Sequence, residues 1–317
     1  MKNFLQPSNS LFPISTSFFL WLVGLLLVTG TEVFGITTTA TGTGNWSTAT
    51  WSAGLPGAGD DVVINGTITL DVTTPALGSL TINNTRTLNL AAGSITVTGT
   101  TTLVGNATMT DNNDAGTNLF IGLVTNSTGA ISSANNSSWE FQGGITAGTT
   151  INLSGTGTKS FTTNNQNITG AGAITFQNVT VASGITITNS NTGTFTVSTT
   201  ATIDGVFSIT GASGLKLFVG LPTISGTGSL TSSSNAPFEF RGGIANSGTL
   251  SLTGTGAKTF STTASQALTG SGDITLNAVT INASITLTNN NTGITTINGA
   301  FALNGTLTDG NDSGSNV

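Results

Sequence analysis

Apolar and hydroxylated side chains alternate along most of the chain, with Val, Ile, Leu or Phe at every second position and Thr or Ser between them. A two-residue period is typical of β-strands that bury one face. It is clear in AITFQNVTVASGITITNSNTG, which starts at Ala173, and in DITLNAVTINASITLTNNNTG, which starts at Asp273. Because no segment after the first 35 residues follows a 3.6-residue period, the pattern predicts an all-β protein.

The pattern also recurs over a long distance. WEFQGG at 139–144 returns as FEFRGG at 238–243, an offset of 99 residues. GTGTKSF ending at Phe161 returns as GTGAKTF ending at Phe260. A fixed long period predicts a stacked array, in which each unit buries its apolar face against its neighbours.

A finer period of about 20 residues lies inside each copy, and it is marked by phenylalanines. They are Phe120, Phe141, Phe161, Phe218, Phe240 and Phe260. One turn of a parallel β-helix has about this length, and stacked turns place equivalent residues roughly 4.8 Å apart. The predicted fold is therefore an all-β parallel β-helix, or β-solenoid, built from ~100-residue repeats of ~20-residue coils, with the phenylalanines in an interior ladder.

Tandem β-sandwich repeats are the alternative, because regular strand spacing alone does not exclude them. Two features favour the β-helix. No linker separates the copies, since the alternation runs through the junction at 196–200. Two-residue hairpin turns, which a sandwich would need, are also scarce.

The beginning of the chain has the layout of a secretory signal peptide. Lys2 precedes an apolar run at 18–28, and Val33-Phe34-Gly35 offers a cleavage site. The run is too short for a membrane anchor, which needs about 20 apolar residues. We predict five segments: signal peptide 1–35, N-terminal cap and first coils 36–96, repeat 1 at 97–196, repeat 2 at 197–296, and the start of a truncated repeat 3 at 297–317.

The amino-acid composition excludes several kinds of binding and catalytic site. Charged residues make up 6% of the chain, against roughly 25% in ordinary globular domains. The net charge is −6 and no basic patch is present, so we expect no nucleic-acid partner. The absence of Cys, His and Tyr excludes disulfides, Ser-His-Asp triads, Cys-His pairs and His-ligated zinc.

One charged pair recurs between the copies. Glu140 returns as Glu239 and Lys159 as Lys258, and the lysine follows the glutamate by 19 residues both times. One hypothesis is an acid/base pair in a groove. We favour a surface ion pair between adjacent coils, worth roughly 0–1 kcal/mol, because nothing else titratable recurs beside it. We therefore predict no catalytic residues.

Two Asp/Asn-rich loops suggest calcium, which prefers several oxygen ligands. They are DNNDAGTN from Asp111 and DGNDSGSN from Asp309, with Asp114 and Asp312 as the second carboxylates. No glutamate closes either loop, and solvated loops with Asx turns are the alternative. Calcium is the only cofactor that the sequence suggests.

Thr-x-Thr pairs begin at Thr96, Thr186, Thr194 and Thr286. An ice-binding array would need such a pair on every coil, and threonine is in any case a good residue for an exposed strand face. Trp139 is replaced by Phe238 in the next copy, which indicates core or edge packing rather than a sugar-binding platform.

The segment GNWSTATWSAGLPGAGDDVVING, at 44–66, resembles the opening of large secreted surface proteins of Bacteroidota-type bacteria, and it is similar to the start of G8-like domains. The resemblance implies an N-terminal cap in which Trp46 and Trp51 cover the first coil and Asp60 shapes the turn into a strand that starts at Asp61. It also implies export, display as an adhesin or stalk, and a C-terminal sorting domain. No sorting domain appears before Val317, so we expect a fragment.

We therefore expect a non-catalytic exported protein, secreted or at the cell surface, that acts as a repeat stalk or adhesin. Its partner would be an extracellular glycan or the surface of a host or neighbouring cell, with no membrane span in the mature chain. An open β-helix edge would favour self-association. The alternatives are a polysaccharide-active β-helix enzyme (lyase or hydrolase) or its carrier region, which needs clustered charges in one groove, and an ice-binding Thr-rich solenoid.

Overall fold

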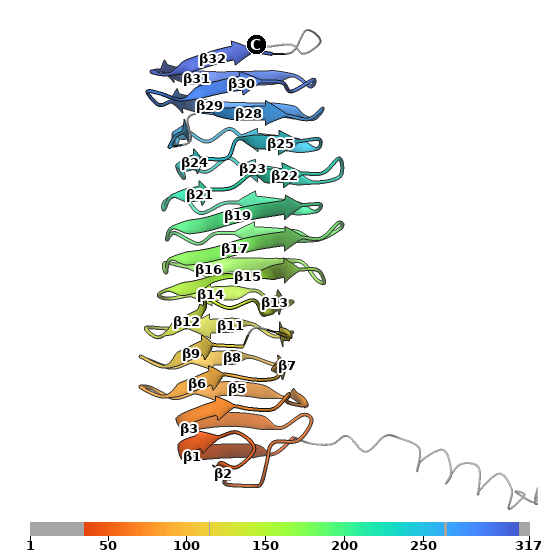
Figure 1. Cartoon of the computed structure of the whole chain (residues 1–317), viewed down its shortest axis with the longest axis vertical. Coiled ribbons are helices and arrows are strands. Elements are labelled where there is room, and N and C mark those ends of the chain that lie inside the picture. The colour runs from red at the N-terminus through yellow and green to blue at the C-terminus, as the bar shows by residue number, and fades with distance from the viewer. Residues whose placement is uncertain (1–34, 114, 263–264, 311–317) are drawn as a thin grey trace, which may run out of the picture. The chain divides into compact units, whose positions relative to one another are not determined.

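The structure is a computed structural model that describes residues 35–310, apart from 114 and 263–264. Almost all of the expected signal peptide therefore lies outside the described residues. The described chain is a parallel β-solenoid of about 13 turns, with about 21 residues per turn and no helix (Figure 1). The predicted fold is confirmed, and tandem sandwiches are wrong, because the described strands pair in parallel except where β1 (Thr37–Asn45) meets β2 (Thr50–Trp51).

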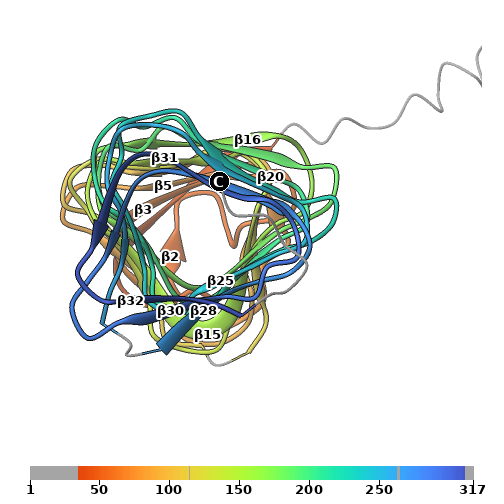
Figure 2. The same cartoon turned by 90° about the horizontal axis from the view of Figure 1, so that it is seen from above.

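Each turn adds one rung to each of three parallel ladders, called face A, face B and face C, which together close around the axis (Figure 2). Face A contains β1, β3 (Asp61–Leu70), β5 (Ser79–Ile82), β8 (Thr101–Leu103), β11 (Val124–Asn126), β14 (Ile145–Ala147), β16 (Gln166–Gly170), β18 (Thr186–Asn189), β20 (Val206–Ile209), β23 (Ser229–Ser232), β26 (Thr249–Leu252), β29 (Asp273–Ile281) and β31 (Thr295–Leu303).

Face B follows face A in each turn, and the second halves of β1, β3, β29 and β31 belong to it. Its other strands are β6 (Thr87–Leu90), β9 (Thr108–Asp111), β12 (Ala130–Ser133), β15 (Ile151–Phe161), β17 (Ile174–Val181), β19 (Phe195–Ile203), β21 (Lys216–Phe218), β24 (Phe238–Phe240) and β27 (Lys258–Phe260). Strand β19 crosses the junction between the predicted repeats without interruption.

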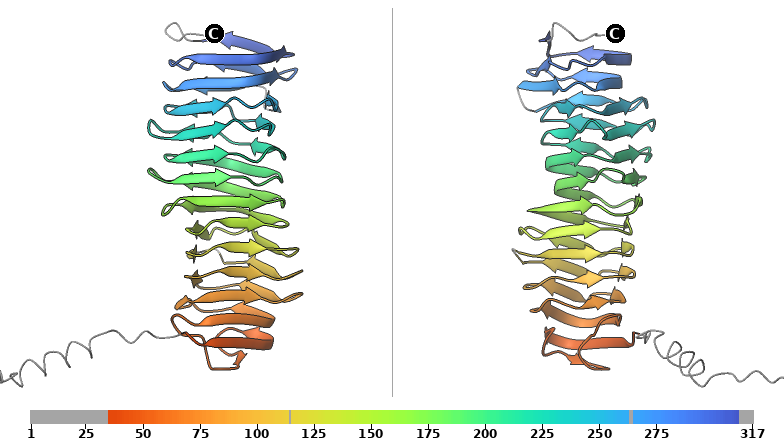
Figure 3. Two further views of the ribbon diagram at one scale, coloured as in Figure 1. Left: turned by 180° about the vertical axis from the view of Figure 1, so that it is seen from behind. Right: turned by 90° about the vertical axis from the view of Figure 1, so that its right-hand side faces the viewer.

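Face C completes the turn and takes the second halves of β15, β17 and β19. Its other strands are β4 (Ala76–Leu77), β7 (Thr96–Val97), β10 (Thr117–Phe120), β13 (Ser138–Phe141), β22 (Pro222–Ile224), β25 (Ile244–Asn246), β28 (Ser265–Thr269), β30 (Thr286–Asn289) and β32 (Thr306–Asp309). The rungs follow one another along the stack in both views of Figure 3.

The core is the inside of the stack, because every second residue of each strand points inward. The predicted phenylalanine ladder is confirmed in both copies. The ring centroids of Phe141 lie 5.9 Å from Phe120 and 5.7 Å from Phe161. The ring of Phe240 lies 5.6 Å from Phe218 and from Phe260. Full burial of such a side chain stabilises the fold by roughly 1.5–3 kcal/mol.

The two copies of the long repeat do not occupy the same faces. Phe141 lies in β13 on face C, whereas its equivalent Phe240 lies in β24 on face B. Likewise Ile145 on face A corresponds to Ile244 on face C. At about 21 residues per turn the offset of 99 residues is about four and two-thirds turns, so the second copy is turned by one face.

The Gly-Gly pair after each phenylalanine motif makes a corner. Gly144 has a φ of +88°, a conformation that side chains disfavour. Its N–H donates to Oε1 of Gln166 in the next turn at 3.1 Å, and the equivalent Gly243 N–H donates to Gln266 at 3.2 Å. The repeated motif therefore serves to close a corner of the stack.

Candidate functional site

The segment that carries the family resemblance lies against the first turn. Trp46 is buried and Trp51 is half-buried, with their ring centroids 4.7 Å apart. The indole Nε1 of Trp51 donates to the carbonyl oxygen of Trp46 at 3.0 Å. Strand β2 pairs with β1 through Trp51 and Ala40, so it covers part of the outer edge of β1.

Asp60 lies at the turn that leads into β3. Its Oδ2 accepts a hydrogen bond from the Gly57 N–H at 2.7 Å, and its Oδ1 accepts one from the Ile36 N–H at 3.0 Å. The neighbouring Asp61 begins β3 and accepts from the Ser79 hydroxyl at 2.6 Å. These carboxylates thus tie the turn to the first two rungs.

The expected surface ion pair between Glu140 and Lys159 is wrong. The ladder pairs Trp139 with Lys159 and Glu140 with Ser160, so the lysine points inward and the glutamate outward. Lys159 is fully buried. Glu140 instead accepts hydrogen bonds from Gln142 at 2.7 Å and from Thr162 at 2.6 Å.

Three lysines share this inward position. The Nζ of Lys159 donates to the carbonyl oxygens of Gly155 at 2.5 Å and Gly157 at 2.6 Å. Lys258, its repeat equivalent, donates to the carbonyl oxygens of Gly254 and Gly256. Burial lowers the pKa of Lys159, of Lys216 and of Lys258 to about 8, although the Asp111 carboxylate acts in the opposite direction on Lys159. The lysine amines therefore bond to carbonyl groups at corners of the stack, and they do not face a groove on its surface.

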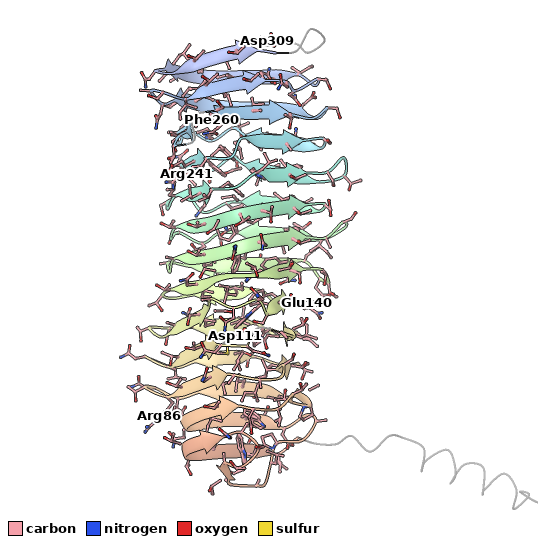
Figure 4. The ribbon with its side chains drawn as sticks, in the orientation of Figure 1. Arg86, Asp111, Glu140, Arg241, Phe260 and Asp309 are labelled. Atoms are coloured by element: carbon pink, nitrogen blue, oxygen red, sulfur yellow. The ribbon has the colours of Figure 1, made fainter. Side chains whose placement is uncertain are left out.

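Glu239, the repeat equivalent of Glu140, is paired with Arg241 rather than with Lys258. Its Oε1 lies 2.7 Å from Arg241 Nε and also accepts from the Ser261 hydroxyl. Burial raises the pKa of Glu239, but the hydrogen bonds from Arg241 and Ser261 outweigh that effect and lower it. Arg241 follows β24 of face B and Glu140 lies in β13 of face C, so the two are labelled at the left and at the right of the stack in Figure 4.

The candidate calcium ligand Asp111 ends β9, and its carboxylate points into the stack with 1% of the residue exposed. Its Oδ2 accepts from Asn118 Nδ2 and from Trp139 Nε1, both at 3.0 Å, and from the Ser137 hydroxyl. Its Oδ1 accepts from the Asn113 N–H at 2.9 Å, which is an Asx turn. The expected Asx turn is therefore confirmed, but this carboxylate does not lie on a solvated loop.

The other three predicted calcium ligands add no evidence for or against a calcium site. Asp309 ends β32 on face C, while Asp114 and Asp312 lie outside the described residues. Across the part of the chain that the structure describes, no three Asp, Glu, His or Cys side chains gather into a metal-binding group.

The described residues contain no helix with the length and apolarity needed to cross a bilayer.

The Thr-x-Thr pairs of the sequence fall on different faces: Thr96 begins β7 on face C, Thr186 begins β18 on face A, Thr194 precedes β19 on face B, and Thr286 begins β30 on face C. Stacking instead builds longer hydroxyl columns that the sequence does not show. Residues at 81, 102, 125, 146 and 169 form an uninterrupted threonine column on face A.

A pair of hydroxyl columns lies farther along face A. Each of the strands β20, β23 and β26 carries one outward hydroxyl, and the residue directly after the strand carries a second one, two residues farther on. They line a shallow depression of about 190 Å³, called the hydroxyl trough, whose six outward side chains are Ser208, Thr210, Thr231, Ser233, Ser251 and Thr253. Sequence reasoning missed this site, because only the strand register brings these residues together.

A larger apolar cavity of about 250 Å³ opens near β31 and β32, lined by core side chains such as Phe260, Leu276 and Leu287. It is the interior of the stack seen at the last described rungs, where Leu303 and Leu307 are 49% and 40% exposed.

No protein-family model, curated protein or solved structure matches the chain.

Proposed function

We propose that the chain is an exported, non-catalytic surface protein whose solenoid acts as a stalk or adhesin. The observation that carries the proposal is the uninterrupted stack of about 13 turns with outward columns of uncharged hydroxyls. Continuous backbone pairing and a continuous apolar core suit a stiff spacer, because each rung is supported by the rungs beside it.

The distribution of basic groups also supports this proposal over a polysaccharide-active enzyme. Such an enzyme would need cations and carboxylates together in one groove. Of the five basic residues after the expected signal peptide, Lys159, Lys216 and Lys258 point into the core. Arg86 and Arg241 lie far apart along the stack (Figure 4). Of the expected partners, an extracellular glycan or the surface of another cell, glycans are rich in hydroxyls, to which hydroxyl-lined faces can bond.

Deletion of the gene in the organism that encodes it tests the proposal. We expect the deletion strain to attach less well to its natural surface or partner cell, and expression of the full chain in trans to restore attachment. Growth on polysaccharides should be unchanged. Normal attachment together with loss of polysaccharide breakdown would contradict the proposal and favour the enzyme.

A further inference from the structure

The hydroxyl trough has two outward hydroxyl columns side by side over three rungs, in a shallow depression of the surface. Ser208, Thr231 and Ser251 stack in one column through the parallel register of β20, β23 and β26. Thr210, Ser233 and Thr253 each follow two residues later, and all three are exposed. Neighbouring rungs lie roughly 4.8 Å apart, so the trough is a regular grid of hydroxyls along the stack axis.

The trough hydroxyls have free hydrogen-bonding capacity. Some outward threonines elsewhere bond to one another: Thr87 and Thr108 do so at 2.8 Å, and so do Thr146 and Thr169. Within the described residues, none of the six trough hydroxyls has a hydrogen bond to another protein group. Each hydroxyl can donate one hydrogen bond and accept two.

The trough carries no charge. None of its lining residues is ionisable. Asp273, on the adjoining rung, pairs with Thr249 outside the trough, and its carboxylate accepts from the Ile294 N–H at 3.0 Å. Acidic sugars and phosphates are usually recognised by arginine or lysine, and here the lysines point into the core.

We propose that the hydroxyl trough binds a neutral polysaccharide chain that lies along the stack axis. This inference rests on the proposed adhesive function and names the class of its ligand. A polymer with hydroxyls at regular intervals can bond to successive rungs, whereas a small ligand would reach only one or two. An ordered layer of ice would need a flat, extended array, and this surface is hollowed over three rungs.

Calorimetric titration of the full chain with cellohexaose, xylohexaose and mannohexaose tests this proposal, with hexagalacturonate as the acidic counterpart. We expect at least one neutral hexasaccharide to bind at millimolar concentration or below, and hexagalacturonate not to bind. The variant T210V/T231V/T253V removes three hydroxyls and keeps the side-chain shape. It should weaken binding by about tenfold or more, since each lost hydrogen bond contributes about 0.5–1.5 kcal/mol.

The matched control is T81V/T102V/T125V, which changes three threonines of the single column on face A, away from the trough. It should bind like the wild type, and circular dichroism should show both variants folded. No binding of any neutral hexasaccharide, or equal binding by the trough variant, would overturn the proposal. Arrest of ice growth that the trough variant abolishes would overturn it in favour of ice binding. If cells that carry the trough variant no longer bind the sugar but still attach, the proposed adhesive function holds and does not depend on the trough.

Discussion

Lys216 shows how a charged residue is accommodated inside this solenoid. It is fully buried, and its Nζ donates to the carbonyl oxygens of Asn191 at 2.9 Å, Gly193 at 3.1 Å and Ser213 at 3.3 Å. Hydrogen bonds to a charged group are stronger than neutral ones. They offset part of the cost of burial and fix a corner whose carbonyl groups point inward.

The lowered pKa values of the buried lysines predict that the free energy of unfolding depends on pH. Burial lowers the pKa of Lys216 from its usual 10.5 to about 8, so the unfolded chain binds more protons than the folded chain between these values. The free energy of unfolding should therefore rise with pH across that window. Cys and Tyr, which would also titrate there, are absent. Urea unfolding at several pH values measures the effect, and the rise should be smaller in K216M. A flat or falling curve for the wild type would contradict it.

The aromatic ladder should account for much of the local stability. Phe240→Ala removes a buried ring that stacks on Phe218 and Phe260. We expect the free energy of unfolding to fall by about 3–5 kcal/mol, because a cavity remains in the core. Leu221→Ala, at a side chain that is 40% exposed, should change it by no more than about 0.5 kcal/mol. Chemical denaturation compares the two, and equal effects would show that the ladder is not the core.

At the scale of elements, the corners limit which residues fit. A Cβ on Gly155 would lie 1.7 Å from the carbonyl oxygen of Asn135 in the preceding turn. Gly155→Ala should therefore separate two rungs and lower the free energy of unfolding by about 1–3 kcal/mol. Gly44→Ala is the control, because a Cβ there meets nothing within 4 Å. Thermal unfolding should separate the two variants, and a neutral Gly155→Ala would contradict the tight stacking.

The sequence predicted the parts of this fold that depend on period. Alternation identified strands, and the recurrence of Phe120, Phe141 and Phe161 identified both the turn length and the inward face. The Glu140–Lys159 pair failed because it depends on register, and a shift of one residue moves a side chain to the other face of a strand. The ladder pairs Trp139 with Lys159, which sends the lysine inside.

The sequence alone did not reveal the hydroxyl trough, for a related reason. Turn lengths vary, so Ser208, Thr231 and Ser251 are separated by unequal intervals in the sequence. Only the paired strands show that they form one column. The hydrogen bonds of the Asp111 carboxylate could not be predicted from the sequence either, because its donors Asn118 and Trp139 come from later strands.

For the whole molecule, the turned repeat means that equivalent surface groups follow a helical path around the stack. Glu140 emerges from face C and Glu239 from face B. A partner that recognises one copy would therefore find the next copy on another side. This arrangement suits a stalk that contacts its surroundings from several directions.

The open end of the stack predicts self-association. No described strand pairs with the far edge of β31 or β32, and Leu303 and Leu307 are partly exposed there. Unpaired strand edges promote association. We expect the purified chain to form oligomers that grow with concentration in light scattering, and Leu307→Lys to reduce them. Thr102→Lys, which adds the same charge to the middle of face A, should not. Monodisperse monomer at high concentration would contradict this prediction.

The measurement that tests the central claim most directly is cysteine labelling on intact cells. The chain contains no Cys, so one introduced thiol reports one position. Thr125 points outward from β11 and Val124 points into the core. If the solenoid is displayed at the cell surface, a membrane-impermeant maleimide will label Thr125→Cys on intact cells and Val124→Cys only after denaturation. Labelling of Thr125→Cys only after the cells are lysed would place the protein inside the cell and contradict a surface stalk or adhesin.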